Sequence, residues 1–306
     1  MRTGLWPNHY DQETNRNHQP ARVQLLHKFW GDTPKLYNHA ILCSVGLPYR
    51  NPGMDVRVFS RTSGNTSLRL EAGALPMADG SFQEIGLPYG PRARLLLLHL
   101  CSEAVFHQSP IIEVEDSFTA FARSLGLATN GRNLKTLRDQ VSRMSAVSMR
   151  LAKSHGSYVD VFQGPIFSKL RAEFPADGPQ LQLWPSFVEF SPDFYESLRH
   201  HAVPLRKEAV GALKHSARAL DVYVWLAHRL CRVSSSKSVR IRWTTLRFQF
   251  GRRDQKMESF KRAFKTALKQ VLMVYPEAKV EIVNGGLCLH RSPPPITKKR
   301  PKRLLA

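Results

Sequence analysis

The chain has 306 residues and a formal net charge of +21. Such an excess of positive charge draws a protein to polyanions, above all to nucleic acids and less often to acidic membrane surfaces. A hydrophobic fraction of 42% excludes wholesale disorder, and the length is typical of about two domains. No segment is apolar for long enough to cross a bilayer, and the first residues lack the apolar core of a signal peptide, so we expect a cytoplasmic protein.

The first half of the chain predicts a leader and a domain. Residues 1–37 are polar and rich in Asn, Gln, His and Pro, which is typical of a flexible leader. The first domain is predicted over residues 38–190. Its strands are expected at residues 40–48, 56–60, 67–71, 111–114, 158–166 and 181–190. Its helices are expected at residues 91–106, 117–125 and about 132–153. The last helix is rich in bases, and three of them are candidate DNA contacts: Arg132, Lys135 and Arg138.

The second half predicts another domain, over residues 191–291. Its helices are expected at residues 191–201, 204–214 and 216–231, with Ser216 as the N-cap of the last. A short strand is expected at 239–243. Two strands at 279–283 and 287–290 should form a hairpin across Asn284–Gly286, a sequence that favours positive φ angles. Residues 292–306 combine Pro with Lys and Arg and predict a flexible basic tail.

The stretch Trp243–Met273 has the order of a helix-turn-helix, with a short helix, a turn and a long basic helix. Thr244 or Thr245 is the expected N-cap of the short helix. Gly251 is expected to end that helix in the left-handed conformation, and Asp254 is the expected cap of the long helix.

The long helix combines an apolar stripe with a basic flank. Helical spacing predicts one buried face, made of Met257, Phe260, Phe264, Ala267, Leu268, Val271 and Leu272. Off this face lie Lys261, Arg262, Lys265 and Lys269. The turn and the first helical turn carry Arg252, Arg253 and Lys256. An amphipathic helix with a solvated basic face would show the same pattern, but the preceding short helix and the overall charge favour a helix that reads DNA.

The same order of elements is predicted twice: helix, short strand, short helix, long basic helix, β-hairpin. The copies run from about residue 91 to 190 and from about 217 to 290. This is the order of a winged helix, in which a hairpin wing follows a helix-turn-helix, although two unrelated basic helices would also produce it. The predicted fold is therefore α+β, with two tandem winged-helix domains.

Several segments resemble the RepA-type plasmid replication initiators. These segments are Leu87–Leu96 (LPYGPRARLL), Phe121–Leu127 (FARSLGL), Ala219–Ala227 (ALDVYVWLA), Trp243–Gly251 with the later Phe260, Phe264 and Leu268, and Tyr275–Leu287. The resemblance covers roughly Ile41 to Pro293.

The resemblance implies two winged-helix domains that bind repeated sites, or iterons, in double-stranded DNA at a plasmid origin. It further implies opening of the adjacent duplex, recruitment of the host initiator and replicative helicase, and dimers that repress their own gene. The reading helix of the family falls on Gln255–Met273. The resemblance therefore implies that the following residues contact DNA: Arg252, Arg253, Lys256, Lys261, Arg262 and Lys265. Lys269 is a further candidate because it lies on the same basic flank.

Nothing in the sequence predicts an enzyme, a cofactor or a metal. There is no phosphate-binding loop of the G-x-x-x-x-G-K-[ST] type and no cluster of carboxylates for a two-metal nuclease. His200 and His201 are adjacent, whereas a nicking initiator of the rolling-circle type needs two histidines that flank one apolar residue. Four widely separated cysteines form no C-x-x-C pair, and we expect them to be free thiols.

Two other functions fit the same residues. A transcriptional repressor of winged-helix fold, acting at its own promoter, would carry the same helix. A general basic protein that binds nucleic acid, including RNA, would share the charge, but an RNA-binding sheet should expose aromatics for base stacking. Here Phe248, Phe250, Phe260 and Phe264 fit core positions.

Overall fold

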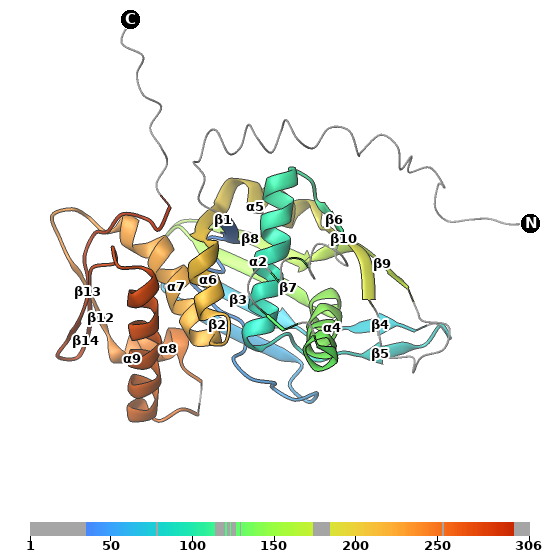
Figure 1. Cartoon of the computed structure of the whole chain (residues 1–306), viewed down its shortest axis with the longest axis horizontal. Helices are drawn as coiled ribbons and strands as arrows, with labels where there is room; N and C mark the ends of the chain where they lie inside the picture. Colours follow the sequence, from blue (N-terminus) through green and yellow to red (C-terminus); the bar gives the residue numbers. More distant parts are fainter. Residues whose placement is uncertain are drawn as a thin grey trace, which may run out of the picture. The chain divides into compact units, whose positions relative to one another are not determined.

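The computed structural model of the chain has a mixed α and β fold, as the predicted α+β class requires (Figure 1). It describes residues 35–77, 79–113, 120, 123, 127–128, 130–173, 184–252 and 254–296, which all lie within one compact unit. The helices of these residues are α2 (Gly90–His107), α4 (Gly131–Ala146), α5 (Pro192–His201), α6 (Lys207–Leu213), α7 (Ala217–Arg229), α8 (Trp243–Phe250) and α9 (Met257–Val274). None of them has the length and apolar character needed to cross a membrane.

The strands pair antiparallel in five small sheets within the described residues. One has four strands, in the order β2 (Val58–Ser63), β3 (Thr66–Glu71), β7 (Ser148–Ser154) and β8 (Val159–Pro165). Two have three strands: β6 (Ile111–Glu113), β10 (Trp184–Phe190) and β9 (Phe167–Glu173) in one, and β12 (Val239–Arg242), β14 (Gly286–Leu289) and β13 (Val280–Val283) in the other. The remaining pairs are β1 (Lys35–His39) with β11 (Ala202–Arg206) and β4 (Ala74–Pro76) with β5 (Phe82–Glu84).

The two three-stranded sheets have the same topology. In one, the strand that follows α2 pairs with β10, and in the other the strand that follows α7 pairs with β14, which gives the orders β6-β10-β9 and β12-β14-β13. From α2 onward the first half runs α2, β6, α4, β9, β10, with the β7–β8 hairpin inserted after α4. From α7 onward the second half runs α7, β12, α8, α9, β13, β14, and α5, β11 and α6 precede α7. The predicted helix 117–125 lies outside the described residues apart from two positions.

The two halves share one hydrophobic core. Helices α2 and α7 pack against each other near its centre, and both are buried along most of their length. Leu95 and Leu96 of α2 and Leu220 and Leu226 of α7 are at most 1% exposed. Ser216 caps α7 as predicted, since its side chain accepts a hydrogen bond from the N–H of Ala219.

A buried ion pair joins α2 to α7. Arg94 Nε and Nη2 lie 2.6 and 2.8 Å from the carboxylate oxygens of Asp221. The guanidinium also donates to the carbonyls of Leu47, Pro48 and Gly90, so all five of its N–H groups have acceptors. Gly46 lies against the same carboxylate, because a Cβ there would come within 2.1 Å of Asp221 Oδ2.

Two expectations about β1 and β11 are wrong. Residues 40–48 form turns and irregular backbone, and the strand instead covers Lys35–His39, which takes in residues 35–37 of the expected leader. The predicted helix 204–214 begins at Lys207, because residues 202–206 pair with this strand. The partners lie in opposite halves of the chain, so no local pattern could indicate the pairing.

The long basic helix of the first half is also shorter than predicted. It ends at Ala146, and residues 148–154 form β7, which lies between β3 and β8. Val147 and Leu151 are spaced for a helix, but Val147, Met149 and Leu151 also alternate as in a strand, and all three are buried. The segment forms a strand rather than a helix because it pairs with β3 on one edge and with β8 on the other. The predicted partners 158–166 and 181–190 consequently belong to different sheets.

We expect Asp221→Asn to lower the free energy of unfolding by about 3–5 kcal/mol, because it leaves the Arg94 charge buried without a counter-charge. Urea unfolding measures this loss. Glu196→Gln is the control: it breaks an ion pair with Arg199 in which both side chains are more than half exposed, and it should leave stability nearly unchanged. Equal effects of the two substitutions would contradict the assigned role of the buried pair.

The free energy of unfolding should also decrease as the pH is lowered, because burial lowers the pKa of three histidines. The pKa is lowered to about 3 for His39 and to about 4 for His99 and His228. His39 Nδ1 accepts the N–H of Ile41, so protonation would break this bond. Because the folded pKa values lie below the unfolded value of about 6.5, protons bind the unfolded chain more tightly, and stability is lost as pH falls below that value.

Between pH 7 and 5 we expect a loss of about 2 kcal/mol for each of these histidines in urea titrations. His39→Gln should flatten the pH dependence by about one such increment. His200→Gln, at an exposed position of α5, should not. A slope that His39→Gln leaves unchanged would contradict this assignment.

Candidate nucleic-acid interface

Helix α9 is fixed by its apolar face, as the sequence predicts. Phe260, Phe264, Ala267, Leu268 and Val271 are at most 3% exposed and pack toward α7 and α8. The Phe264 ring lies at the centre of an aromatic cluster, with centroid distances of 6.0, 5.5 and 5.6 Å to Trp243, Phe250 and Phe260. The buried face therefore sets which side of α9 meets solvent.

The opposite face of α9 is basic and exposed. It carries Arg262, Lys265 and Lys269, spaced by three and four residues, together with Thr266 and Met273. Within the described residues no acidic side chain forms an ion pair with these three bases. Lys265 Nζ lies 5.8 Å from the centroid of Trp243, which holds it over the start of α8.

The other predicted contacts of this half differ in availability. Lys256 is exposed. Lys261 is half-buried and donates to Glu258 Oε1 at 2.8 Å, a bond that holds the Glu258 pKa below its ordinary value. Arg252 lies 3.6 Å from Asp254, and Arg253 lies outside the described residues.

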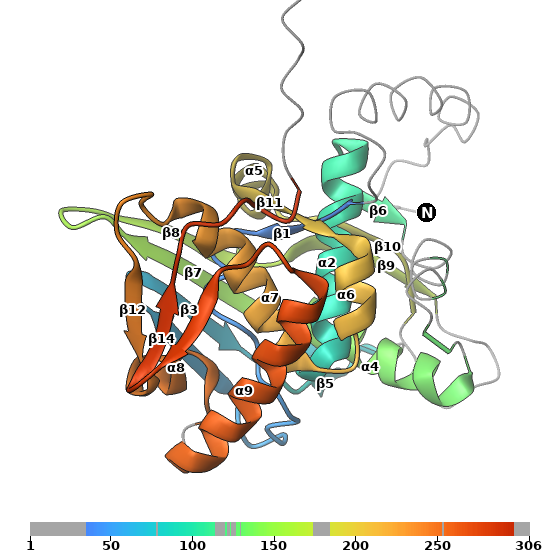
Figure 2. The same cartoon turned by 60° about the vertical axis from the view of Figure 1, so that its left-hand side comes forward.

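The sheet β12-β14-β13 stands on the same side of the molecule as α9 (Figures 1 and 2). Its hairpin turns at Asn284 and Gly285, and Gly285 has a φ of +88°, as the Asn-Gly sequence predicts. The Gly285 carbonyl accepts the N–H of Trp243 at 2.9 Å, so the turn is attached to the start of α8. This bond holds the hairpin in place relative to the helices.

Strand β12 adds two exposed bases, Arg240 and Arg242, that sequence reasoning missed. They alternate with Val239 and Ile241, which pack against the core. The alternation is visible in the sequence VRIR, and this pattern predicts that both arginines point to the solvent side of the strand.

The predictions that Thr244 or Thr245 caps α8 and that Asp254 caps α9 are wrong, whereas Gly251 ends α8 as predicted but not in the left-handed conformation. Helix α8 starts at Trp243, before Thr244 and Thr245, because the Gly285 carbonyl rather than a hydroxyl receives its first N–H. Gly251 is extended, with φ −86° and ψ 174°, and is needed because a Cβ would lie 2.4 Å from the Arg247 carbonyl. Asp254 precedes the helix and pairs with Arg252, while Lys256 occupies the N-cap position of α9 without a side-chain cap bond.

Phe248 also departs from its predicted core position. Its side chain is 70% exposed, whereas Phe250 is 3% exposed. The two residues lie on different sides of α8, since a helix turns through about 200° in two residues. The apolar run alone does not reveal which phenylalanine faces solvent.

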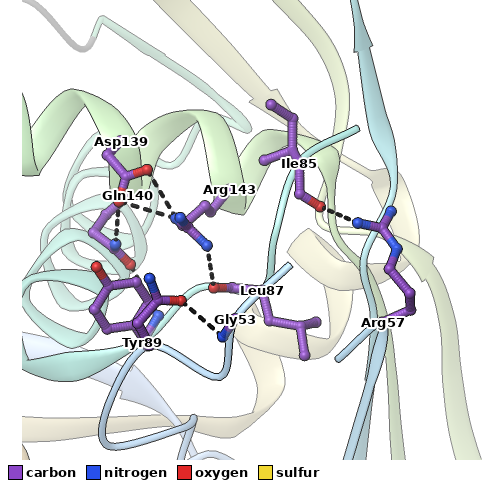
Figure 3. Close-up of polar contacts among 9 residues, drawn as sticks. Gly53, Arg57, Ile85, Leu87, Tyr89, Asp139, Gln140 and Arg143 are labelled. Atoms are coloured by element: carbon purple, nitrogen blue, oxygen red, sulfur yellow. Dashed lines mark hydrogen bonds and ion pairs between the residues drawn. The ribbon is translucent and has the colours of Figure 1, made fainter. Parts of the chain in front are cut away.

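One base of α4, the basic helix of the first half, is committed to contacts within the fold (Figure 3). Arg143 donates to Asp139 at 2.9 Å and to the Leu87 carbonyl at 3.2 Å, and it stacks over Tyr89. Gln140 Oε1 accepts the N–H of Tyr89 at 2.9 Å. These bonds hold the Leu87–Tyr89 segment, which leads into α2.

Of the three candidate contacts on α4, Lys135 is exposed and Arg138 is half-buried. The side chain of Arg132 lies outside the described residues. The described part of α4 therefore offers less free positive charge than α9 does.

Other candidate chemistry is not assembled within the described residues. No group of three or more His, Cys, Asp or Glu side chains there is placed to hold a metal ion. His200 and His201 each bond within α5, to Glu196 and to the Ser197 carbonyl. All four cysteines are free thiols, and Cys43, Cys101 and Cys288 are buried.

A helix held by one apolar face, with an outward row of unpaired bases and an adjoining hairpin, is suited to binding a polyanion. The family described as "Plasmid encoded RepA protein" matches residues 87–246, more than half of the chain, and the chain belongs to this family. The resemblance seen in the sequence is thereby confirmed. Helix α9 lies beyond the matched residues.

Two crystal structures of domains 2 and 3 of RctB are similar to the chain. One aligns with a TM-score of 0.49 and 11% identity over 83% of this chain and 96% of that one. The other has a TM-score of 0.48 and 12% identity over 81% and 94%. No curated protein sequence matches the chain.

Proposed function

We propose that the chain initiates plasmid replication by binding repeated sites in double-stranded origin DNA. The observation that carries the proposal is the exposed face of α9, where Arg262, Lys265 and Lys269 form no ion pair with an acidic side chain of the described residues. Membership of the RepA family adds the plasmid context. The proposal assigns the chain a binding role and no catalytic step.

We further propose that both halves are winged helices, divided near residue 190. The shared sheet orders β6-β10-β9 and β12-β14-β13 support this, since one places the strand after α2 beside β10 and the other places the strand after α7 beside β14. In the second half, α8 and α9 would form the helix-turn-helix and β13–β14 the wing. Residues 191–291 would then make the stronger contact with DNA.

The exposed face of α9 would lie in the major groove, with Arg262, Lys265 and Lys269 reaching base edges or phosphates. Arg240 and Arg242 on β12 extend the positive surface toward the wing, where backbone phosphates are the natural partners. The first half would contact a neighbouring segment of DNA through Lys135 or pair with a second subunit. Opening of the duplex and recruitment of the host initiator and helicase would follow binding.

The double substitution Arg262→Ala with Lys269→Ala should weaken binding to the origin repeats and reduce the slope of log K against log salt by about 2, because each phosphate contact contributes about 0.9. Fluorescence anisotropy between roughly 50 and 200 mM salt measures both effects. Arg199→Ala, which removes an exposed helical arginine from α5, is the control and should leave the slope unchanged. An unchanged slope in the double variant would place the interface elsewhere.

A plasmid that carries only this gene and its flanking repeats should replicate in a suitable host, and the α9 double variant should abolish its maintenance. Transformation frequency and plasmid copy number measure this. Specific binding without replication would favour a transcriptional repressor. Uniform binding to any duplex, without the roughly 10³-fold preference expected of a specific site, would favour a general basic protein.

A further inference from the structure

Three arginines surround one tyrosine where the two halves meet. The guanidinium carbons of Arg61 on β2, Arg94 on α2 and Arg218 on α7 lie 5.1, 5.0 and 5.1 Å from the ring centroid of Tyr49. Asp221 neutralises Arg94 through the buried pair. Among the described residues no acidic side chain forms an ion pair with Arg61 or Arg218, so the cluster keeps two positive charges in excess.

The cluster also holds buried polar atoms that lack partners. Arg61 Nη1, Arg218 Nε and the Tyr49 hydroxyl are each buried without a hydrogen bond, and Arg61 is only 9% exposed. Buried donors are nearly always satisfied in native proteins, because each unsatisfied group is destabilising. Stacking on the Tyr49 ring attracts the guanidinium groups but neither neutralises their charge nor accepts these N–H groups.

The tyrosine is able to act as a donor. Burial raises the pKa of Tyr49 to about 12, so its hydroxyl keeps its proton near neutral pH. Tyr49 and Arg218 are only half-buried, so the cluster is close to the surface. Two guanidinium groups and a phenol O–H supply several hydrogen-bond donors around one ring, a combination that suits an anion with several oxygens.

The remaining bonds of the two arginines lead to the turn before α9. Arg61 Nη2 donates to the Gly251 carbonyl at 3.1 Å, and Arg218 Nη2 donates to Gln255 Oε1 at 3.2 Å. Gln255 Oε1 also accepts the N–H of Arg252. Helix α8 packs beside β2. Through the bonds to Gly251 and Gln255 the cluster contacts the segment that leads into α9.

We propose that Arg61, Arg218 and Tyr49 bind a phosphate group, either a backbone phosphate of the DNA or free phosphate. Phosphate supplies the charge and the oxygens that the cluster lacks, and guanidinium groups match its geometry. Bound there, it would link β2 of the first half to α7 and to the turn before α9. Only the DNA source depends on the proposed function.

The first test is thermal unfolding of the full chain in inorganic phosphate and in chloride of equal ionic strength. Phosphate near ten times its Kd should raise Tm by roughly 2–4 °C through the site. Tyr49→Phe removes only a hydroxyl that has no partner, so it should leave Tm in chloride unchanged or slightly higher and should reduce the phosphate effect. Arg218→Gln should reduce it further.

Tyr223→Phe is the matched control. Its buried hydroxyl already accepts the N–H of Arg206 at 3.0 Å, so this variant should lose stability equally in both salts. General exclusion of phosphate from protein surfaces stabilises all variants alike. Only the difference between variants therefore reports the site.

The second test identifies the source of the phosphate. If a DNA phosphate is bound, Arg218→Gln should lower the salt slope of DNA binding by about 1, and ethylation of one defined phosphate should weaken the wild-type chain but not the variant. Phosphate-specific stabilisation with an unchanged DNA slope would assign the site to free phosphate. The proposal is overturned if Tyr49→Phe and Arg218→Gln change neither quantity. A chain that binds no DNA but shows the phosphate effect would refute the proposed function alone.

Discussion

The buried pair of Arg94 and Asp221 is the contact on which the arrangement of the two halves depends. Arg94 lies one turn into α2 and Asp221 one turn into α7, and the two carboxylate oxygens receive a two-point bond from the guanidinium. A charge removed from water is tolerated only when it is paired and hydrogen-bonded. Arg94 meets this condition through Asp221, the carbonyls of Leu47 and Pro48, and the carbonyl of Gly90 at the start of α2. A different docking of α2 on α7 would leave at least one of these charges alone, so the pair selects one relative orientation.

That orientation has consequences for α9. The same segment places Tyr49 between Arg61, Arg94 and Arg218, and two of these arginines bond to the turn that precedes α9. The aromatic cluster around Phe264 and the Trp243–Gly285 hydrogen bond then hold the helix and the hairpin as one unit. The basic face is thus held by contacts that reach from β2 to the β13–β14 hairpin, so both halves determine its position.

The features of the fold and of the candidate interface that depend on a local sequence pattern were predictable. The buried face of α9, the cap at Ser216 and the Asn-Gly turn follow from spacing and side-chain chemistry over a few residues. The predictions that are wrong concern segments whose partners lie elsewhere. Thr244 does not cap α8, because the carbonyl of Gly285 in the β13–β14 hairpin accepts the first N–H of this helix. Residues 148–154 form a strand because β3 and β8 pair with them. Phe248 faces solvent, while Phe250, on the other side of α8, packs in the core.

The sequence by itself determined the charge, the family and the apolar stripe that makes α9 two-faced. These properties depend on composition and on periodicity within single elements. Only the tertiary structure decided which bases are free. Lys261 is paired and half-buried, Arg143 is committed to Leu87 and Asp139, and Arg240 joins the exposed surface. The reason is physical: a Lys or Arg has the same charge wherever it stands, but its availability depends on the acids, carbonyls and rings that folding brings within reach.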